Sequence, residues 1–195
     1  MKTLNLTLRT ILLTLALVGT VTSALAYDFV VKGIYYNING DEATVTYKRQ
    51  YKEYTGYNGV YNTYYENDCV GDVFIPETVT YNGNTYTVTA IGEYAFYDRY
   101  ATTALSGISL PNTITSIGSS AFRGCTGLKS ISIPESVTTI ASCAFDNCCG
   151  LKNANISKSV ISIGDFAFRD CTGLTDITIP NSVTTIGQYA FYYCI

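Results

Sequence analysis

The sequence predicts a repeat solenoid, a parallel β stack of short strands and tight turns that follows a β-rich cap. Three observations carry this prediction. Leu105, Leu128, Leu151 and Leu174 recur every 23 residues. All 4 prolines occupy one place in the repeating unit, and 15 of the 18 tyrosines precede Leu105. A unit of this length cannot bury its apolar residues alone, so such repeats gain stability by stacking on one another.

The first 26 residues have the pattern of a secretory signal peptide. Lys2 and Arg9 give a basic start, Ile11 to Val21 is a mainly apolar run, and Ala24-Leu25-Ala26 ends the segment. The run is too short for a transmembrane helix, which needs about 20 apolar residues. No later segment could span a bilayer. We therefore predict cleavage after Ala26 and a secreted or cell-surface location.

Residues 27–68 are predicted to form a β-rich cap over the first coil. Ile34 to Ile38 and Ala43 to Tyr47 are typical strands, and Asn39-Gly40 between them is a strong hairpin signal. A tyrosine cluster follows, with Tyr54, Tyr57 and Tyr61 among its members. These rings either pack on the first coil, as strand-rich caps favour, or form an exposed recognition patch.

Residues 69–104 are interpreted as a degenerate first repeat. Val73 to Val79 matches the front of the repeat and Ile91 to Phe96 matches its back. The insertion between them contains Asn82-Gly83, which predicts a hairpin with a type I′ turn. Arg99 stands where the other repeats have cysteine.

Residues 105–195 contain four registered copies of the repeat, with columns of Ile, Ala, Phe and Cys that hardly vary. Ile131-Ser132-Ile133 alternates as a strand with one buried face, and Pro134 ends it because proline has no N–H for a ladder. Val137 and Ile140 are predicted to return to the core. Glycines such as Gly118 mark a corner, and the segment before each Ala-Phe pair is predicted to form one short helical turn. Phe is expected to stack on Phe, and Cys on Cys.

The unit resembles the BspA-like leucine-rich repeats, whose pattern is LxxIxIPxSVTxIGxxAFxxCxx. The resemblance is close from Leu105 to Ile195 and loose from Val73 to Arg99. It implies a leucine-rich-repeat-like parallel solenoid in a secreted or surface-displayed protein. Members are associated with adhesion, and no catalytic activity defines the family. The Gly33–Ile38 segment also looks like the lead-in of secreted Bacteroidota members.

Three substitutions depart from that pattern, and two of them fall in one repeat. Ser157 replaces the proline, Ala154 replaces the strand isoleucine and Ala141 replaces the corner glycine. The third repeat is therefore expected to be the least regular.

The 7 cysteines do not point to a chemical site. Cys125, Cys148, Cys171 and Cys194 occupy a column that needs a small buried hydrophobe, so we expect reduced core thiols. Cys143, Cys148 and Cys149 lack the spacing of a zinc site. The chain has no histidine, which excludes His-based triads and His-metal sites.

No enzymatic activity, cofactor or metal is therefore predicted. No acidic cluster has calcium-loop spacing, and nothing favours a glycosidase-like carboxylate pair. The net charge of −3 argues against nucleic-acid binding.

The leading functional hypothesis is a secreted or cell-surface scaffold that binds a protein or glycan and mediates adhesion. Its candidate surface is the outward side of the repeat strands, namely Ser109, Ser130, Ser132, Asn153, Asn155, Asp176 and Thr178, with Tyr54, Tyr57 and Tyr61 of the cap. The alternative is a structural or self-assembling surface component. In that case the outer coil, Leu174 to Ile195, would meet a second copy of the chain, because an unpaired strand edge recruits other strands.

Overall fold

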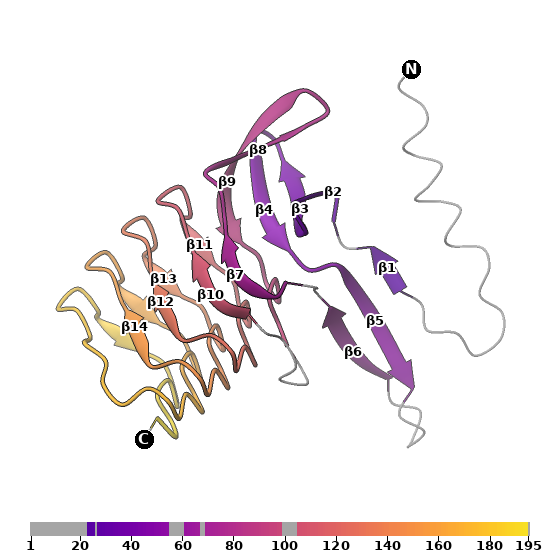
Figure 1. Cartoon of the computed structure of the whole chain (residues 1–195). Helices are drawn as coiled ribbons and strands as arrows, with labels where there is room; N and C mark the ends of the chain where they lie inside the picture. The colour runs from indigo at the N-terminus through magenta and orange to yellow at the C-terminus, as the bar shows by residue number, and fades with distance from the viewer. Residues whose placement is uncertain (1–22, 26, 55–60, 67–68, 99–104, 195) are drawn as a thin grey trace.

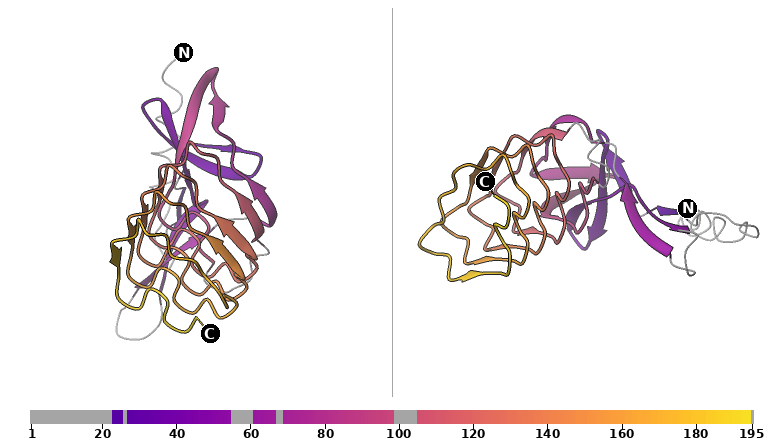
Figure 2. Two further views of the ribbon diagram at one scale, coloured as in Figure 1. Left: turned by 90° about the vertical axis from the view of Figure 1, so that its left-hand side faces the viewer. Right: turned by 90° about the horizontal axis from the view of Figure 1, so that it is seen from below.

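The computed structural model describes residues 23–25, 27–54, 61–66, 69–98 and 105–194. Its described residues form strands and turns, which stack from the N-terminal cap to the last repeat (Figure 1). Viewed along the stack, successive coils superimpose (Figure 2). We call residues 105–127, 128–150, 151–173 and 174–194 coils 1 to 4. No helix among the described residues is long and apolar enough to cross a membrane.

Each coil has three sides. Strands occur on two of these sides, although coil 4 carries a strand on only one. One side, the strand face, holds β7 (Gly71–Phe74), β10 (Leu105–Ser109), β12 (Ser130–Ser132) and β14 (Asn153–Asn155). The second side holds β9 (Asn84–Ile91), β11 (Ser116–Ile117), β13 (Thr139–Ile140), β15 (Ser162–Ile163) and β16 (Thr185–Ile186). The third side, the turn side, carries no strand.

The register of the second side confirms the predicted stacking of the repeats. Ile91, Ile117, Ile140, Ile163 and Ile186 are successive partners in one parallel ladder. The degenerate repeat takes part on both sides, because β7 also pairs in parallel with β10 through Val73 and Ile108. Residues at equivalent positions of successive repeats therefore lie against one another in the stack.

The turn side differs from the predicted short helical turn. In coil 1 the N–H groups of Ala121, Arg123 and Cys125 bond to the carbonyl three residues back. Those of Ser120, Phe122 and Gly124 donate instead to carbonyls of coil 2. An α-helix would use these donors internally, so alternate tight turns form in its place.

Left-handed residues produce this path. In coil 1 they are Ser120, with a φ of 56°, and Gly124, with a φ of 78°. Equivalent pairs, Cys143 with Asn147 and Phe166 with Asp170, recur in the next two coils. Three of these six, Ser120, Cys143 and Phe166, are not among the residue types that commonly adopt this conformation, which are glycine, asparagine and aspartate. The stacked coils thus hold ordinary residues in a conformation that no local sequence signal announces.

Phenylalanine forms the centre of the core, as predicted. Phe96, Phe122, Phe145, Phe168 and Phe191 stack ring on ring, with centroids 5.1–5.4 Å apart. The leucines that open coils 1 to 3 are fully buried, as are Val137, Ile140 and the alanine before each of the inner phenylalanines.

The corner glycines are required for a different reason from the one expected. Gly118 does not have a positive φ. A Cβ placed on it would lie 2.6 Å from the backbone nitrogen of Glu93, and one on Gly164 would lie 2.6 Å from that of Ser142. At Gly118 and Gly164 the close approach of the neighbouring coil leaves no room for a side chain, whereas coil 2 accommodates Ala141 at the same corner. Space, and not backbone freedom, therefore favours glycine at these two positions.

The cap extends the second side of the solenoid. β2 (Phe29–Val31), β3 (Ile34–Asn39) and β4 (Glu42–Thr46) continue the sheet, and β4 pairs in parallel with β9. The predicted β3–β4 hairpin is present, but Asn39 pairs with Glu42, so its loop is Gly40-Asp41, one residue later than expected. The type I′ turn is confirmed between β8 (Thr78–Tyr81) and β9, since Asn82 and Gly83 both have positive φ.

The later part of the predicted cap belongs to a separate three-stranded sheet, which lies beside β2–β4 (Figure 1). It consists of β1 (Ser23–Leu25), β5 (Arg49–Tyr54) and β6 (Tyr61–Glu66), all antiparallel. β1 belongs to the predicted signal peptide, so cleavage after Ala26 would remove it and leave the β5–β6 hairpin.

Candidate functional site

The strand face exposes all seven repeat residues that the sequence nominates for binding. Ser109, Ser130, Ser132, Asn153, Asn155, Asp176 and Thr178 are each exposed. Parallel pairing of β12 with β14 sets Ser130 beside Asn153 and Ser132 beside Asn155. The Asn155 amide donates to the Ser132 hydroxyl over 3.2 Å. These short polar side chains form rows on a rigid surface, since their strands are held from behind by a continuous core.

The nominated tyrosines fall in the separate sheet. Tyr54 and Tyr61 are paired residues at the end of the β5–β6 ladder. Tyr57 and the Arg99 position lie outside the described residues.

The strand face is hollowed between coils 3 and 4. A cavity of about 700 Å³ lies between Asn153–Ile156 on one wall and Asp176–Ser182 on the other. Residues 174–180 form no strand, although the sequence there has the same alternation as in coil 2. We call this hollow the coil 3–4 groove. The sequence predicts that coil 3 is the least regular, but coil 3 keeps its strand β14. The irregularity lies instead at the junction between coil 3 and coil 4.

A smaller hollow of about 290 Å³ lies between β10 and β12, near Ile108, Leu110 and Ile133. Here one backbone hydrogen bond, from the Lys129 N–H to the Ser106 carbonyl, still joins the two coils. The strand face is therefore a row of strand pairs with gaps between them.

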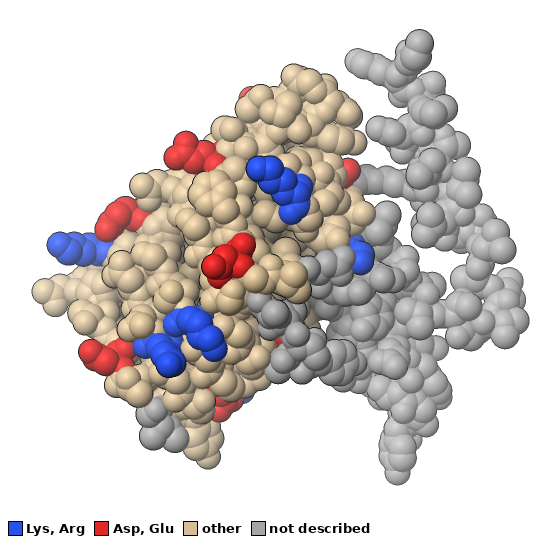
Figure 3. Space-filling view, in the orientation of Figure 1, with Lys and Arg blue, Asp and Glu red and all other residues tan. Residues whose placement is uncertain are grey.

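Charged side chains are scattered over the coils, and most of the visible surface is uncharged (Figure 3). The exception is an ion-pair row on the turn side. The fully buried Asp146 carboxylate accepts from Arg123 at 2.9 Å and from both Nε and a terminal nitrogen of Arg169, at 2.8 and 2.7 Å. The hydrogen bonds to Asp146 raise the pKa of Arg169.

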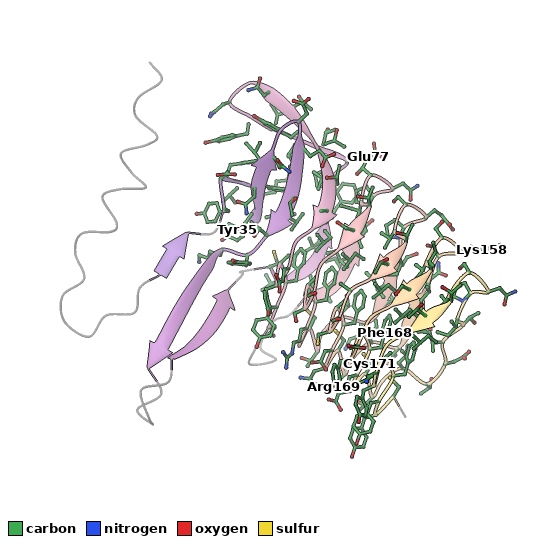
Figure 4. The ribbon with its side chains drawn as sticks, turned by 180° about the vertical axis from the view of Figure 1, so that it is seen from behind. Tyr35, Glu77, Lys158, Phe168, Arg169 and Cys171 are labelled. Atoms are coloured by element: carbon green, nitrogen blue, oxygen red, sulfur yellow. The ribbon has the colours of Figure 1, made fainter. Side chains whose placement is uncertain are left out.

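No prediction from the sequence covers this row. The signal was available, because Arg123, Asp146 and Arg169 occupy one position of the repeat. Stacking places them in line with alternating charge. Figure 4 shows Arg169 at the turn side, away from Lys158 at the opposite corner.

The cysteine column forms a ladder of thiol hydrogen bonds. Cys125, Cys148 and Cys171 are completely buried, and each thiol donates to the carbonyl of the column phenylalanine in the preceding repeat, at 3.0–3.1 Å. The acceptors are Phe96, Phe122 and Phe145, respectively. Cys194 makes the same bond at 3.0 Å but is half-buried, because it belongs to the outermost described coil. Burial raises the pKa of Cys125, Cys148 and Cys171.

The column residues Cys125, Cys148, Cys171 and Cys194 carry free thiols in the structure. We expect thiol titration of denatured, non-reduced protein to find the four column thiols free. In native protein at pH 8, Cys149 is expected to react with a thiol reagent long before the column, because a buried neutral thiol is a poor nucleophile. Fewer than three titratable thiols after denaturation would contradict the ladder.

Candidate metal ligands do not gather into a cluster among the described residues. No group of three or more His, Cys, Asp or Glu residues among them could hold a metal ion. Cys148 points into the core and not toward Cys143 or Cys149, which lie in partly exposed turns. The exposed groups that the strand face presents are hydroxyls, amides and the Asp176 carboxylate.

Comparison with known proteins agrees with this architecture. A leucine-rich repeat protein from Bacteroides ovatus is 35% identical, with a TM-score of 0.70 over 86% of this chain and 39% of that one. The leucine-rich repeat protein of T. pallidum is 27% identical, with a TM-score of 0.66 over 86% of this chain and 67% of that one. The pneumococcal vaccine antigen PcpA, 21% identical with a TM-score of 0.51, shares the fold. This chain thus spans well under half the length of the Bacteroides protein.

The comparison with curated proteins found no match. The family model that matches is the BspA type leucine-rich repeat region, in six copies over residues 89–195. That range contains coils 1 to 4, with β11, β13, β15 and β16 of the second side, so the family model covers the repeats that carry the nominated strand-face residues. The chain belongs to the BspA type leucine-rich repeat family.

Proposed function

We propose that this protein is a secreted or cell-surface scaffold that mediates protein–protein contact or adhesion through its strand face. The observation that carries the proposal is the exposure of all seven polar positions on the strand face, of which Ser130 with Asn153 and Ser132 with Asn155 are in register. Each contact to such a row is weak, but display of many copies on a surface strengthens binding without any new contact. The predicted signal peptide would deliver the chain to that location.

A binding assay on solubilised extracellular matrix tests the proposal. Ser132→Arg/Asn155→Arg/Thr178→Arg places bulky charges along the strand face and is expected to weaken binding by at least about tenfold. The matched control, Ser116→Arg/Thr139→Arg/Thr185→Arg, alters exposed residues of one column on the second side and is expected to leave binding unchanged. Equal loss in both variants, or no binding by the unaltered protein, would contradict the proposal.

A second candidate function is self-assembly through coil 4. Coil 4 exposes apolar surface that the inner coils bury or lack, with Ile186 at 51%, Tyr189 at 58%, Tyr192 at 48% and Tyr193 at 56% exposure. The tyrosine rings pack together: Tyr189 meets Tyr192 edge-on and stacks on Phe166 of coil 3. An exposed apolar patch, beside a strand edge of β16 that has no partner among the described residues, favours association with another strand.

Hydrogen exchange and light scattering at two concentrations separate the two candidates. If coil 4 self-associates, its amides exchange rapidly in dilute protein and gain protection in concentrated protein as the scattering mass rises. If the strand face alone binds, the protein stays monomeric and exchange does not depend on concentration. Tyr189→Ser/Tyr193→Ser is expected to abolish any association.

A further inference from the structure

We infer that the coil 3–4 groove takes an extended peptide segment of a partner protein, which adds a strand to the free edge of β14. This inference rests on the proposed function, and it names the place of contact and the class of ligand. It is carried by the hydrogen bonding, shape and lining of the groove.

The edge of β14 that faces the groove lacks a backbone partner among the described residues. On its other edge β14 pairs with β12, and the Asn155 carbonyl accepts from the Ile133 N–H at 2.9 Å. Alternate residues of a strand direct their backbone groups to opposite edges, so the N–H and carbonyl of Ala154 face coil 4. No backbone hydrogen bond joins residues 152–157 to residues 174–181.

The opening is confined to one side of the coil. On the second side β15 pairs with β16, and on the turn side the Phe168 N–H donates to the Ala190 carbonyl at 2.7 Å. Coil 4 is therefore anchored on two sides and separated on the third. The groove is already formed, so a ligand does not need to unfold the coil to reach β14.

The lining of the groove has the alternation that a strand partner requires. Ala154 and Ile177 are half-buried, whereas Asn155 and Thr178 are exposed. Ala154 is the small member of a column that otherwise holds Ile108, Ile131 and Ile177. The missing side-chain volume at Ala154 leaves room for an apolar side chain from a ligand.

These features favour a peptide over a sugar. Backbone hydrogen bonds to an open strand edge supply affinity in strand addition, and pockets for alternate side chains supply specificity. The volume of about 700 Å³ lies within the range of ligand sites, about 300–1,000 Å³. No aromatic ring lines the groove among the described residues, so stacking against a sugar ring is not offered.

The chain's own β12 segment provides a probe. A capped peptide with the sequence of residues 128–134 has the side chains that already pair with β14 on its other edge. Titration into isotope-labelled full chain is expected to give saturable amide shifts centred on Asn153–Ile156 and Ile177–Thr178. A peptide of the same sequence, N-methylated along its central amides, is expected to bind at least about tenfold more weakly because it cannot form the ladder.

Two matched variants locate the site. Ala154→Ile restores the column residue, fills the groove and is expected to abolish peptide binding while raising hydrogen-exchange protection at residues 176–178. The control is Thr138→Ile, which adds a similar apolar side chain at an exposed position of coil 2. The equivalent residue of coil 3 is already an exposed isoleucine, Ile161. This variant is expected to bind the peptide as the unaltered protein does.

The outcomes separate this inference from the proposed function. Absence of saturable shifts, shifts centred elsewhere, equal binding of the N-methylated peptide, or unaltered binding by Ala154→Ile would each overturn the groove inference. Matrix binding by the unaltered protein in any of those cases would leave the proposed function standing. If Ala154→Ile loses both matrix binding and peptide binding, the result would support the groove inference and the proposed function together.

Discussion

Replacing Phe145 by alanine is expected to lower the free energy of unfolding by about 3–5 kcal/mol. Phe145 is completely buried and stacks on Phe122 at 5.2 Å and on Phe168 at 5.1 Å. Both neighbours belong to other coils, so the cavity cannot be filled by local rearrangement of one turn. Urea denaturation of the variant and the unaltered protein measures the difference.

Phe166→Ala is the matched control for this prediction. Phe166 lies in the next coil at a half-buried, left-handed position, where its ring covers Arg169 and stacks on Tyr189. Little core is lost on its removal, so we expect a cost of about 1 kcal/mol. Equal costs for the two substitutions would mean that the phenylalanine column does not carry the stability of the stack.

The stacked columns of equivalent residues could be predicted from the sequence, because residues that recur every 23 positions come into contact when the coils stack. Leu128 and Leu151 are equivalent by counting, and both are fully buried in the structure. The alternation in Ile131-Ser132-Ile133 likewise predicts which side chains face outward, and Ser132 is exposed while its neighbours are buried. Both inferences need only the repeat length and the period of a strand.

The turn path and the groove could not be predicted in this way. Ser120, Cys143 and Phe166 share a left-handed conformation but no side-chain property, so the neighbouring coil determines it. Coil 4 contains the same strand pattern as coil 2, yet residues 174–180 stay unpaired. Ala154 alone does not explain the gap, because β12 pairs with β14 despite Ala154 and does not pair with β10 although both carry isoleucine there.

Stability is expected to fall steeply above pH 9 because of the thiol ladder. Burial raises the pKa of Cys125, Cys148 and Cys171 above the ordinary value of 9.0, so the folded protein keeps these thiols neutral. The unfolded chain releases their protons once the pH passes that value. A group whose pKa is raised on folding stabilises fully below its unfolded pKa and loses that contribution as the pH rises. For three thiols the loss amounts to about 3 kcal/mol between pH 9 and pH 10.

Urea denaturation at pH 7, 8, 9 and 10, in the presence of a reductant, measures this slope. Cys125→Ala/Cys148→Ala/Cys171→Ala is expected to be less stable at pH 7 but nearly independent of pH from 8 to 10. Cys143→Ser/Cys149→Ser alters two partly exposed cysteines and is expected to keep most of the slope of the unaltered protein. Burial also raises the pKa of Tyr36 above 10.0, which adds to the loss only at higher pH. A stability that stays flat to pH 10 in the unaltered protein would show that the column thiols ionise in place, and that the coils separate far enough to admit water.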